Sequence, residues 1–264
     1  MTERFTILLK LLFISSIILT AGAVPPTLRE GMSLAGIDGK LTEEQDKWFF
    51  ELESDLTDGE AFVRAGQKIQ LLPSATLEKM TADAEKRATT GYRIWGTVTQ
   101  YQHANFIFPL YFLPLSKVID ANEHTEQQSQ RQTPDITINE PNDKLPIPQE
   151  IINLLKPARL ARTEEIGKGM ELKQDVILAD RTATLACDSD ETFRFVLDAP
   201  GRNVPTVSFK LLPCQVLQQA QAIQSARAEP VRFKIAAILT RYKGENCLLL
   251  QRATRLYSHQ NFDR

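Results

Sequence analysis

The sequence Ile-Gln-Leu-Leu-Pro-Ser-Ala-Thr-Leu at residues 69–77 recurs in altered form as Phe-Lys-Leu-Leu-Pro-Cys-Gln-Val-Leu at residues 209–217. Both stretches keep the frame Leu-Leu-Pro followed, four residues after the proline, by a further Leu. A second match follows in the same order, because Tyr-Arg-Ile-Trp-Gly-Thr-Val-Thr-Gln-Tyr at 92–101 lies over Phe-Lys-Ile-Ala-Ala-Ile-Leu-Thr-Arg-Tyr at 233–242. Two matched segments in one order indicate an internal duplication, which decides the interpretation of the fold.

The second copy shows a clear order of local signals. Apolar and β-branched patterns predict strands at residues 176–185, 193–197, 207–212, 233–240 and from 247 onward. Pro213 ends the third strand, and apolar residues at helical spacing then predict a helix over 216–223. In the first copy, Ser74 is the predicted N-cap of the matching helix.

Three strands, a helix and two strands form the element order of a five-stranded OB-type barrel. We therefore expect a mostly β protein with short helices, built as two tandem OB-like five-stranded barrels that are joined by a polar linker. Element order alone leaves two alternatives open, which are two unrelated α+β domains and one larger β-sandwich.

The chain divides into four segments. Residues 1–23 are a predicted signal peptide, with Arg4 and Lys10 before an apolar stretch and small residues at the cleavage site. Residues 24–120 form the first repeat, 121–146 a flexible polar linker without aromatic residues, and 147–264 a short helix between Pro148 and Pro157 plus the second repeat. We expect an exported protein, periplasmic or extracellular, with no membrane span after cleavage; an uncleaved anchor is the alternative.

Charge limits the classes of partner. The net charge of −2 and the pI near 6.0 argue against a protein that coats nucleic acid, because such a protein needs an excess of basic residues. Residues 24–120 carry a net negative charge, and residues 171–264 carry a net positive one. The two copies could therefore dock on each other, or these charges could simply be solvated surface.

The sequence predicts no catalytic site, no metal site and no cofactor. It contains no Gly-x-Ser-x-Gly motif, and its histidines are His103, His124 and His259. The three cysteines form no Cys-x-x-Cys pair. We therefore expect a protein that is not an enzyme.

Export would make a disulfide chemically possible. Cys187 and Cys214 both fall near predicted strand ends, so they are the candidate pair, with free thiols as the alternative. Cys247 aligns with Phe106 inside an apolar run and is predicted to be a buried thiol.

Two functions from different classes remain. The first is a non-enzymatic interaction or scaffolding protein of the bacterial envelope, whose partner is another envelope protein or the other repeat of the same chain. The second is an OB-type protein that binds an oligosaccharide or a single-stranded nucleic acid. For the second, Trp95 and Tyr101 are candidates to stack on a sugar. A basic strip is the other candidate ligand surface, and its members are Arg194, Lys210 and Lys234.

The run Arg-Tyr-Lys-Gly-Glu-Asn-Cys-Leu-Leu-Leu-Gln-Arg-Ala at residues 241–253, with the Leu-Leu-Pro motif upstream, resembles exported bacterial proteins that have no assigned activity. The resemblance covers mainly the second copy. It implies export and the duplicated module, and it assigns a role to no residue.

Overall fold

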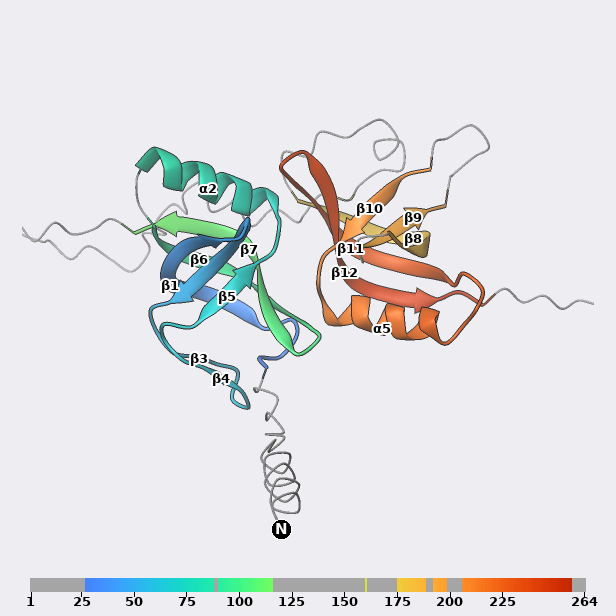
Figure 1. The fold of residues 1–264 in the computed structure, drawn as a ribbon, viewed down its shortest axis with the longest axis horizontal. Helices are drawn as coiled ribbons and strands as arrows, with labels where there is room; N and C mark the ends of the chain where they lie inside the picture. The colour runs from blue at the N-terminus through green and yellow to red at the C-terminus, as the bar shows by residue number, and fades with distance from the viewer. Residues whose placement is uncertain are drawn as a thin grey trace, which may run out of the picture.

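The computed structural model describes residues 27–87, 90–115, 160, 175–188, 192–198 and 206–257 (Figure 1). The predicted signal peptide, the polar linker and the short helix between Pro148 and Pro157 lie outside these residues. No helix in the described ranges is long and apolar enough to cross a membrane.

The first half of the chain forms a closed barrel in the order β1-β2-β5-β7-β6. Its elements are β1 (Ser33–Glu44), β2 (Lys47–Leu52), β5 (Lys68–Leu71), α2 (Ala75–Arg87), β6 (Gly91–Tyr101) and β7 (Ala104–Pro114). Strands β5 and β7 pair in parallel, whereas the other neighbours are antiparallel. Closure leaves this sheet without free edges.

The second half forms a closed barrel with the same cyclic order of strands. Its elements are β8 (Val176–Cys187), β9 (Phe193–Leu197), β10 (Ser208–Leu211), α5 (Gln215–Ser225), β11 (Arg232–Tyr242) and β12 (Glu245–Arg255). Here the parallel pair is β10 with β12. The prediction of a mostly β protein with five-stranded barrels is therefore confirmed.

The two Leu-Leu-Pro stretches occupy equivalent places in their barrels. Gln70 is the register partner of Phe106, and Lys210 is the register partner of Cys247. Each stretch then leaves its barrel through a leucine amide that donates to the fifth strand: Leu72 does so in the first barrel and Leu212 in the second. Each proline follows, and the helix begins two residues later.

Side-chain alternation builds the two cores. Along β6, Tyr92, Ile94 and Val98 are fully buried, and along β11, Phe233 and Ile235 are fully buried in the same pattern. The hairpin turns after these strands also match, because both central residues of each turn have positive φ. Such two-residue turns suit the twist of an antiparallel hairpin.

Both helices begin with a side-chain cap at the same position. The Leu77 amide donates to Ser74 Oγ at 3.0 Å, which confirms the predicted N-cap. In the second barrel, the Leu217 amide donates to Cys214 Sγ at 3.4 Å, and the thiol is fully buried. The suggested bridge from Cys214 to Cys187 is not formed, because all three cysteines are free, with Cys187 exposed at the end of β8.

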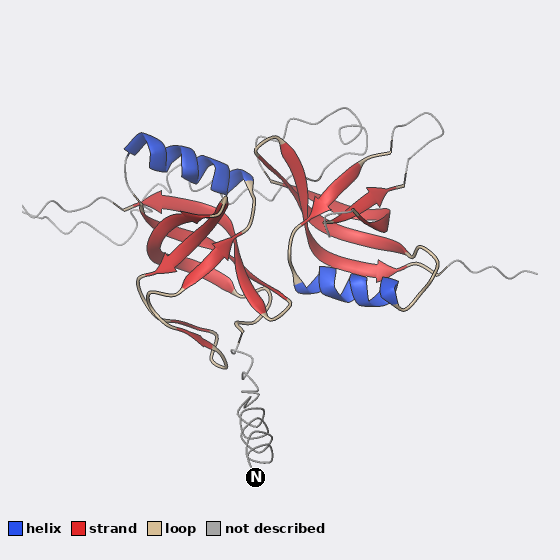
Figure 2. Cartoon of the chain, viewed as in Figure 1, coloured by secondary structure: helices blue, strands red, loops and turns tan. Residues whose placement is uncertain are grey.

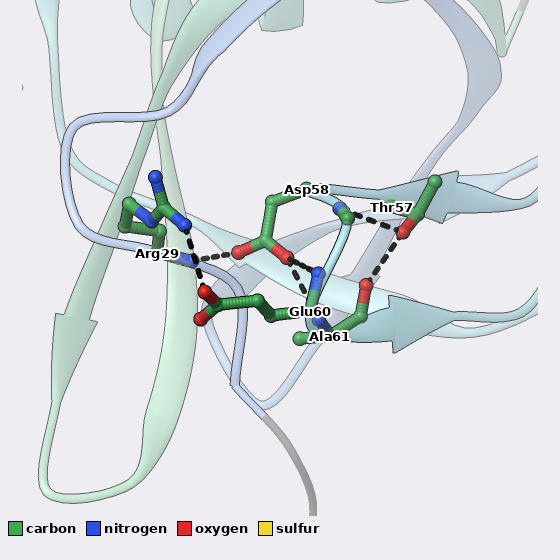
Figure 3. Close-up of polar contacts among 6 residues, drawn as sticks. Arg29, Thr57, Asp58, Glu60 and Ala61 are labelled. Carbon is green, nitrogen blue, oxygen red and sulfur yellow. Dashed lines mark hydrogen bonds and ion pairs between the residues drawn. The ribbon is translucent and has the colours of Figure 1, made fainter.

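A small hairpin distinguishes the first barrel and was not predicted. Strands β3 (Leu56–Thr57) and β4 (Phe62–Val63) lie between β2 and β5. Figure 3 shows the Asp58 carboxylate at its turn, where it accepts hydrogen bonds from the amides of Arg29, Glu60 and Ala61 at 2.6, 2.9 and 2.7 Å. These amides lower the pKa of Asp58 to about 2. The turn therefore ties the hairpin to the chain segment that precedes β1.

The two barrels contact each other in a reciprocal way, because a hairpin of each barrel reaches the helix of the other. The β6–β7 hairpin reaches α5 of the second barrel, and the β11–β12 hairpin reaches α2 of the first (Figure 1). The Gln102 amide donates to Gln218 Oε1 at 3.2 Å, and at the matching position the Lys243 amide donates to Glu78 Oε2 at 3.3 Å. In this view α2 lies along the upper side of its barrel and α5 along the lower side of the other (Figure 2).

Equivalent buried threonines lie at the centre of this docking interface. Thr99 Oγ1 donates to the Pro213 carbonyl at 3.1 Å. Thr240 Oγ1 accepts from the Ala75 amide, the first residue of α2, at 2.9 Å and donates to Asp175 Oδ1 at 2.6 Å. Both threonine side chains are almost fully buried. The interface therefore satisfies the first amide of α2 and a carbonyl just before α5.

Each barrel also places one carboxylate near the helix of the other. Glu30 Oε2 accepts from the Gln215 amide at the start of α5 at 3.4 Å, and from the Gln100 amide at 2.5 Å. Burial raises the pKa of Glu30, and the two amides partly offset that effect. Burial likewise raises the pKa of Asp175, against the opposing effects of Thr240 and the more distant Lys79.

Among the described residues no ion pair of side chains joins the barrels, so they dock through amides, hydroxyls and apolar surface rather than through opposite net charges.

A candidate binding face on the first barrel

The outer side of the first barrel carries a surface that we call the aromatic face. Its members come from β1, β6 and β7, and they are Gly36, Asp38, Arg93, Trp95, Tyr111 and Leu113. The register makes them neighbours, because Trp95 is the cross-strand partner of Tyr111, and Arg93 is the partner of both Asp38 and Leu113. Direct partners in an antiparallel pair point to the same side of the sheet.

Trp95 lies against a glycine. Gly36 has φ +81° at an irregularity in the pairing of β1 with β6, and a Cβ built there would lie 3.0 Å from Trp95 Cζ2. The indole and the Tyr111 ring have centroids 5.4 Å apart at an interplanar angle of 49°. The missing side chain at Gly36 therefore lets the indole approach the backbone of β1, and the Tyr111 ring packs beside the indole.

An ion pair borders the aromatic rings. Arg93 Nε and Nη2 donate to the two Asp38 oxygens at 2.6 and 2.8 Å, a bidentate arrangement. The Arg93 guanidinium holds the pKa of Asp38 below its ordinary value, so the pair stays charged at neutral pH. The face therefore combines aromatic surface with one fixed dipole.

Two leucines extend the face with apolar surface that water reaches. Leu113 is 43% exposed, and Leu110, at the bulge in β7, is 49% exposed. The Leu110 carbonyl accepts from Thr76 Oγ1 of α2 at 3.1 Å, which fixes this part of β7. An exposed apolar cluster on a rigid sheet suits recognition of another molecule.

The second barrel has different chemistry at the same place. Ala236 and Arg252 stand where the first barrel has Trp95 and Tyr111. Asp180, with φ +52°, joins Arg252 at 3.0 Å and Lys234 at 3.4 Å. The shared backbone therefore presents an aromatic face on one barrel and an ionic face on the other.

The structure separates the two aromatic candidates. Trp95 faces outward as expected, beside Tyr111, which sequence reasoning did not single out. Tyr101 lies instead in the docking interface, where its hydroxyl pairs with the Gln221 side chain at 2.9 to 3.1 Å and its ring packs on the second core. Strand alternation identifies outward residues but not those that a second domain covers.

The expected basic strip is also divided. Arg194 and Lys210 are cross-strand partners, and Glu245 lies 3.7 Å from the first and 3.4 Å from the second. Asp188 lies 3.7 Å from Arg194 as well. Lys234 sits on β11 with Asp180 instead. Carboxylates therefore offset these cations, and the three residues do not form one surface.

Within the described ranges, no group of three or more His, Cys, Asp or Glu side chains could hold a metal ion. His103 lies exposed in the turn between β6 and β7. Burial raises the pKa of Cys214 and of Cys247 to about 11, so neither thiol is a ready nucleophile.

Comparisons with known proteins identify no family. No protein-family model and no curated protein matches the sequence. Among solved structures, a deletion mutant of the single-stranded DNA binding protein from Thermus aquaticus is matched over 89% of this chain and 99% of its own, with 11% sequence identity and a TM-score of 0.22. A match with so low a TM-score indicates neither the fold nor a ligand of this chain.

Proposed function

We propose that the chain is a non-enzymatic interaction protein of the bacterial envelope, in which two docked barrels present the aromatic face to an apolar surface of a protein partner. The observation that carries this proposal is the exposure of Leu110 and Leu113 beside Trp95 and Tyr111. Aromatic residues and arginine are enriched in the cores of protein interfaces, and charged pairs are common at their rims.

The docked arrangement supports this role. The halves of β6 and β7 that carry the aromatic face lie away from Thr99 and Tyr101, which contact the second barrel. A partner could therefore bind without separating the barrels. The rigid backbone under Trp95 and Leu110 also limits the entropy that binding would cost.

Site-specific photo-crosslinking in cells tests the proposal. A photoreactive residue replaces Leu113 in one variant and Thr254 in the other, because Thr254 holds the equivalent register position on the second barrel. We expect one discrete protein adduct from position 113 that the further change Trp95→Ala abolishes, and none from position 254. Equal adducts from both positions, or none from position 113, would contradict the proposal.

An oligosaccharide is the second candidate ligand, because a bidentate ion pair beside Trp95 and Tyr111 could orient a sugar that stacks on the rings. Titration of glycans into the Trp48→Phe variant, whose remaining tryptophan is Trp95, would give a saturable fluorescence change. No change across a glycan panel would rule against it.

We further propose that the two barrels are tandem copies of one OB-like module and that the chain is exported. The matched strand order, the matched Leu-Leu-Pro registers and the matched helix caps support the duplication. Fractionation of cells followed by N-terminal sequencing tests export: we expect a mature protein that begins near Val24 outside the cytoplasm, and an intact start at Met1 would contradict it.

A further inference from the structure

A pocket on the second barrel, remote from the aromatic face in the chain, gathers three arginines. Its volume is about 380 Å³, and it lies between the segment that follows α5 and the outer ends of β11 and β12. The charged and aromatic residues of its wall are Arg227, Glu229, Arg232, Arg255 and Tyr257. This volume is within the range of small-molecule sites.

Two of these arginines have no acidic partner among the described residues. Arg232 pairs with Asp198. In the part of the chain that the structure describes, Arg227 and Arg255 form no ion pair. The Arg255 guanidinium instead lies 4.5 Å from the centre of the Tyr257 ring, which orients it.

The wall of the pocket is held in place by its own hydrogen bonds. The Gln224 side chain accepts from the Val231 amide at 2.8 Å and donates to the Glu229 carbonyl at 3.1 Å. The Leu256 amide donates to the Arg232 carbonyl at 2.8 Å. The segment after α5 and the ends of the two strands are thus fixed before any ligand arrives.

The first barrel shows that the fold does not require Arg232 or Arg255. Its Leu115 amide donates to the Gly91 carbonyl in the contact that matches Leu256 with Arg232. Pro114 stands opposite Tyr92 where Arg255 stands opposite Phe233. Glycine and proline hold the same backbone positions in the first barrel, so the backbone requires neither the Arg232 nor the Arg255 guanidinium.

We infer that this pocket binds the phosphate group of a small phosphate monoester. With Arg232 offset by Asp198, Arg227 and Arg255 against Glu229 leave the pocket an excess of about one positive charge, which attracts a group that carries about −1.5 to −2 at neutral pH. The planar fork of arginine matches phosphate oxygens in pairs. The exposed Tyr257 and Leu256 offer apolar contact to the remainder of the molecule.

NMR titration tests the inference directly. The Nε–Hε signals of the arginine side chains are followed as glycerol phosphate, and separately inorganic phosphate, is added at constant ionic strength. We expect saturable shifts for Arg255 and Arg227, with a dissociation constant on the order of 1 mM. Arg255→Gln should weaken binding at least tenfold, whereas Arg194→Gln, outside the pocket, should leave it unchanged.

Three outcomes would overturn the inference: no saturable shift with either phosphate, binding that Arg255→Gln leaves unaltered, or equal shifts when acetate replaces phosphate. Thermal unfolding of each variant shows whether it remains folded. The pocket and the aromatic face lie on different barrels. The absence of phosphate binding would therefore contradict only this inference, and the absence of the protein adduct at position 113 would contradict only the proposed function.

Discussion

The docking interface predicts that two equivalent threonines contribute unequally to stability. Thr240→Val keeps the shape of the side chain but removes the hydroxyl that accepts from the Ala75 amide and donates to Asp175. Losing an uncharged hydrogen bond in a buried place costs about 1 to 3 kcal/mol, and a bond to a charged group costs about 1.5 to 3 kcal/mol. Because Asp175 also lies near the Ala75 amide and offsets part of the loss, we expect a total of about 3 kcal/mol.

Thr99→Val is the matched control. Among the described residues Thr99 Oγ1 makes a single hydrogen bond, to the Pro213 carbonyl, so its removal should cost only about 1 kcal/mol. Urea unfolding at pH 7, with free energies extrapolated to water, measures both changes. If Thr99→Val costs as much as Thr240→Val, or more, the described roles of the two hydroxyls are wrong.

Three further predictions follow from single contacts. Burial raises the pKa values of Glu30 and Asp175 above their ordinary values of 4.5 and 3.8, so near those pH values the folded protein binds more protons than the unfolded chain. The free energy of unfolding should therefore increase as the pH falls toward the ordinary pKa values, and this contribution should be lost as the pH rises through the folded pKa values. Urea titrations across pH should show a weaker dependence of this sign in the Glu30→Gln/Asp175→Asn variant, and an unchanged profile would contradict it. Cys214→Ser should keep or increase the melting temperature, because serine caps helices well, while Cys214→Ala should cost about 1 kcal/mol; equal effects would refute a capping role. Gly36→Ala should destabilise more than Gly31→Ala and shift the tryptophan emission, since both have positive φ but only Gly36 touches the indole; equal losses would mean that this contact is unimportant.

Local signals in the sequence were enough for the barrel strands and the helix starts, but they did not indicate the β3–β4 hairpin. The Leu-Leu-Pro frame and Ser74 predicted where a strand ends and a helix begins, because proline and capping act within a few residues. The parallel pairing that brings Gln70 beside Phe106 and closes the barrel joins segments far apart in the chain. No local pattern reports such a pairing, so closure remained one of several alternatives.

The site was less predictable than the fold. Outward alternation identified Trp95, but the same alternation placed Tyr101 on a surface that the second barrel covers. The supposed basic strip failed for a similar reason, because Glu245 comes from a distant strand that pairs beside Lys210. Side-chain direction follows from local periodicity, whereas neighbours across the barrel depend on register and docking.

The difference in net charge between the two halves of the chain contributes little to docking. The reciprocal contacts use helix amides, threonine hydroxyls and two carboxylates of raised pKa. Interactions of this kind depend on geometry more than on net charge, so moderate salt should leave the docked state intact.

Cysteine cross-linking across the interface tests the reciprocal docking most directly. In a background with exposed Cys187 changed to serine, the pairs Glu78→Cys/Lys243→Cys and Gln102→Cys/Gln218→Cys link opposite ends of the interface. A short bifunctional maleimide should join both pairs rapidly within one chain, as a faster band in denaturing gels that dilution does not remove. Cross-linking of both pairs no faster than that of two exposed, remote positions would contradict the docked arrangement of the barrels.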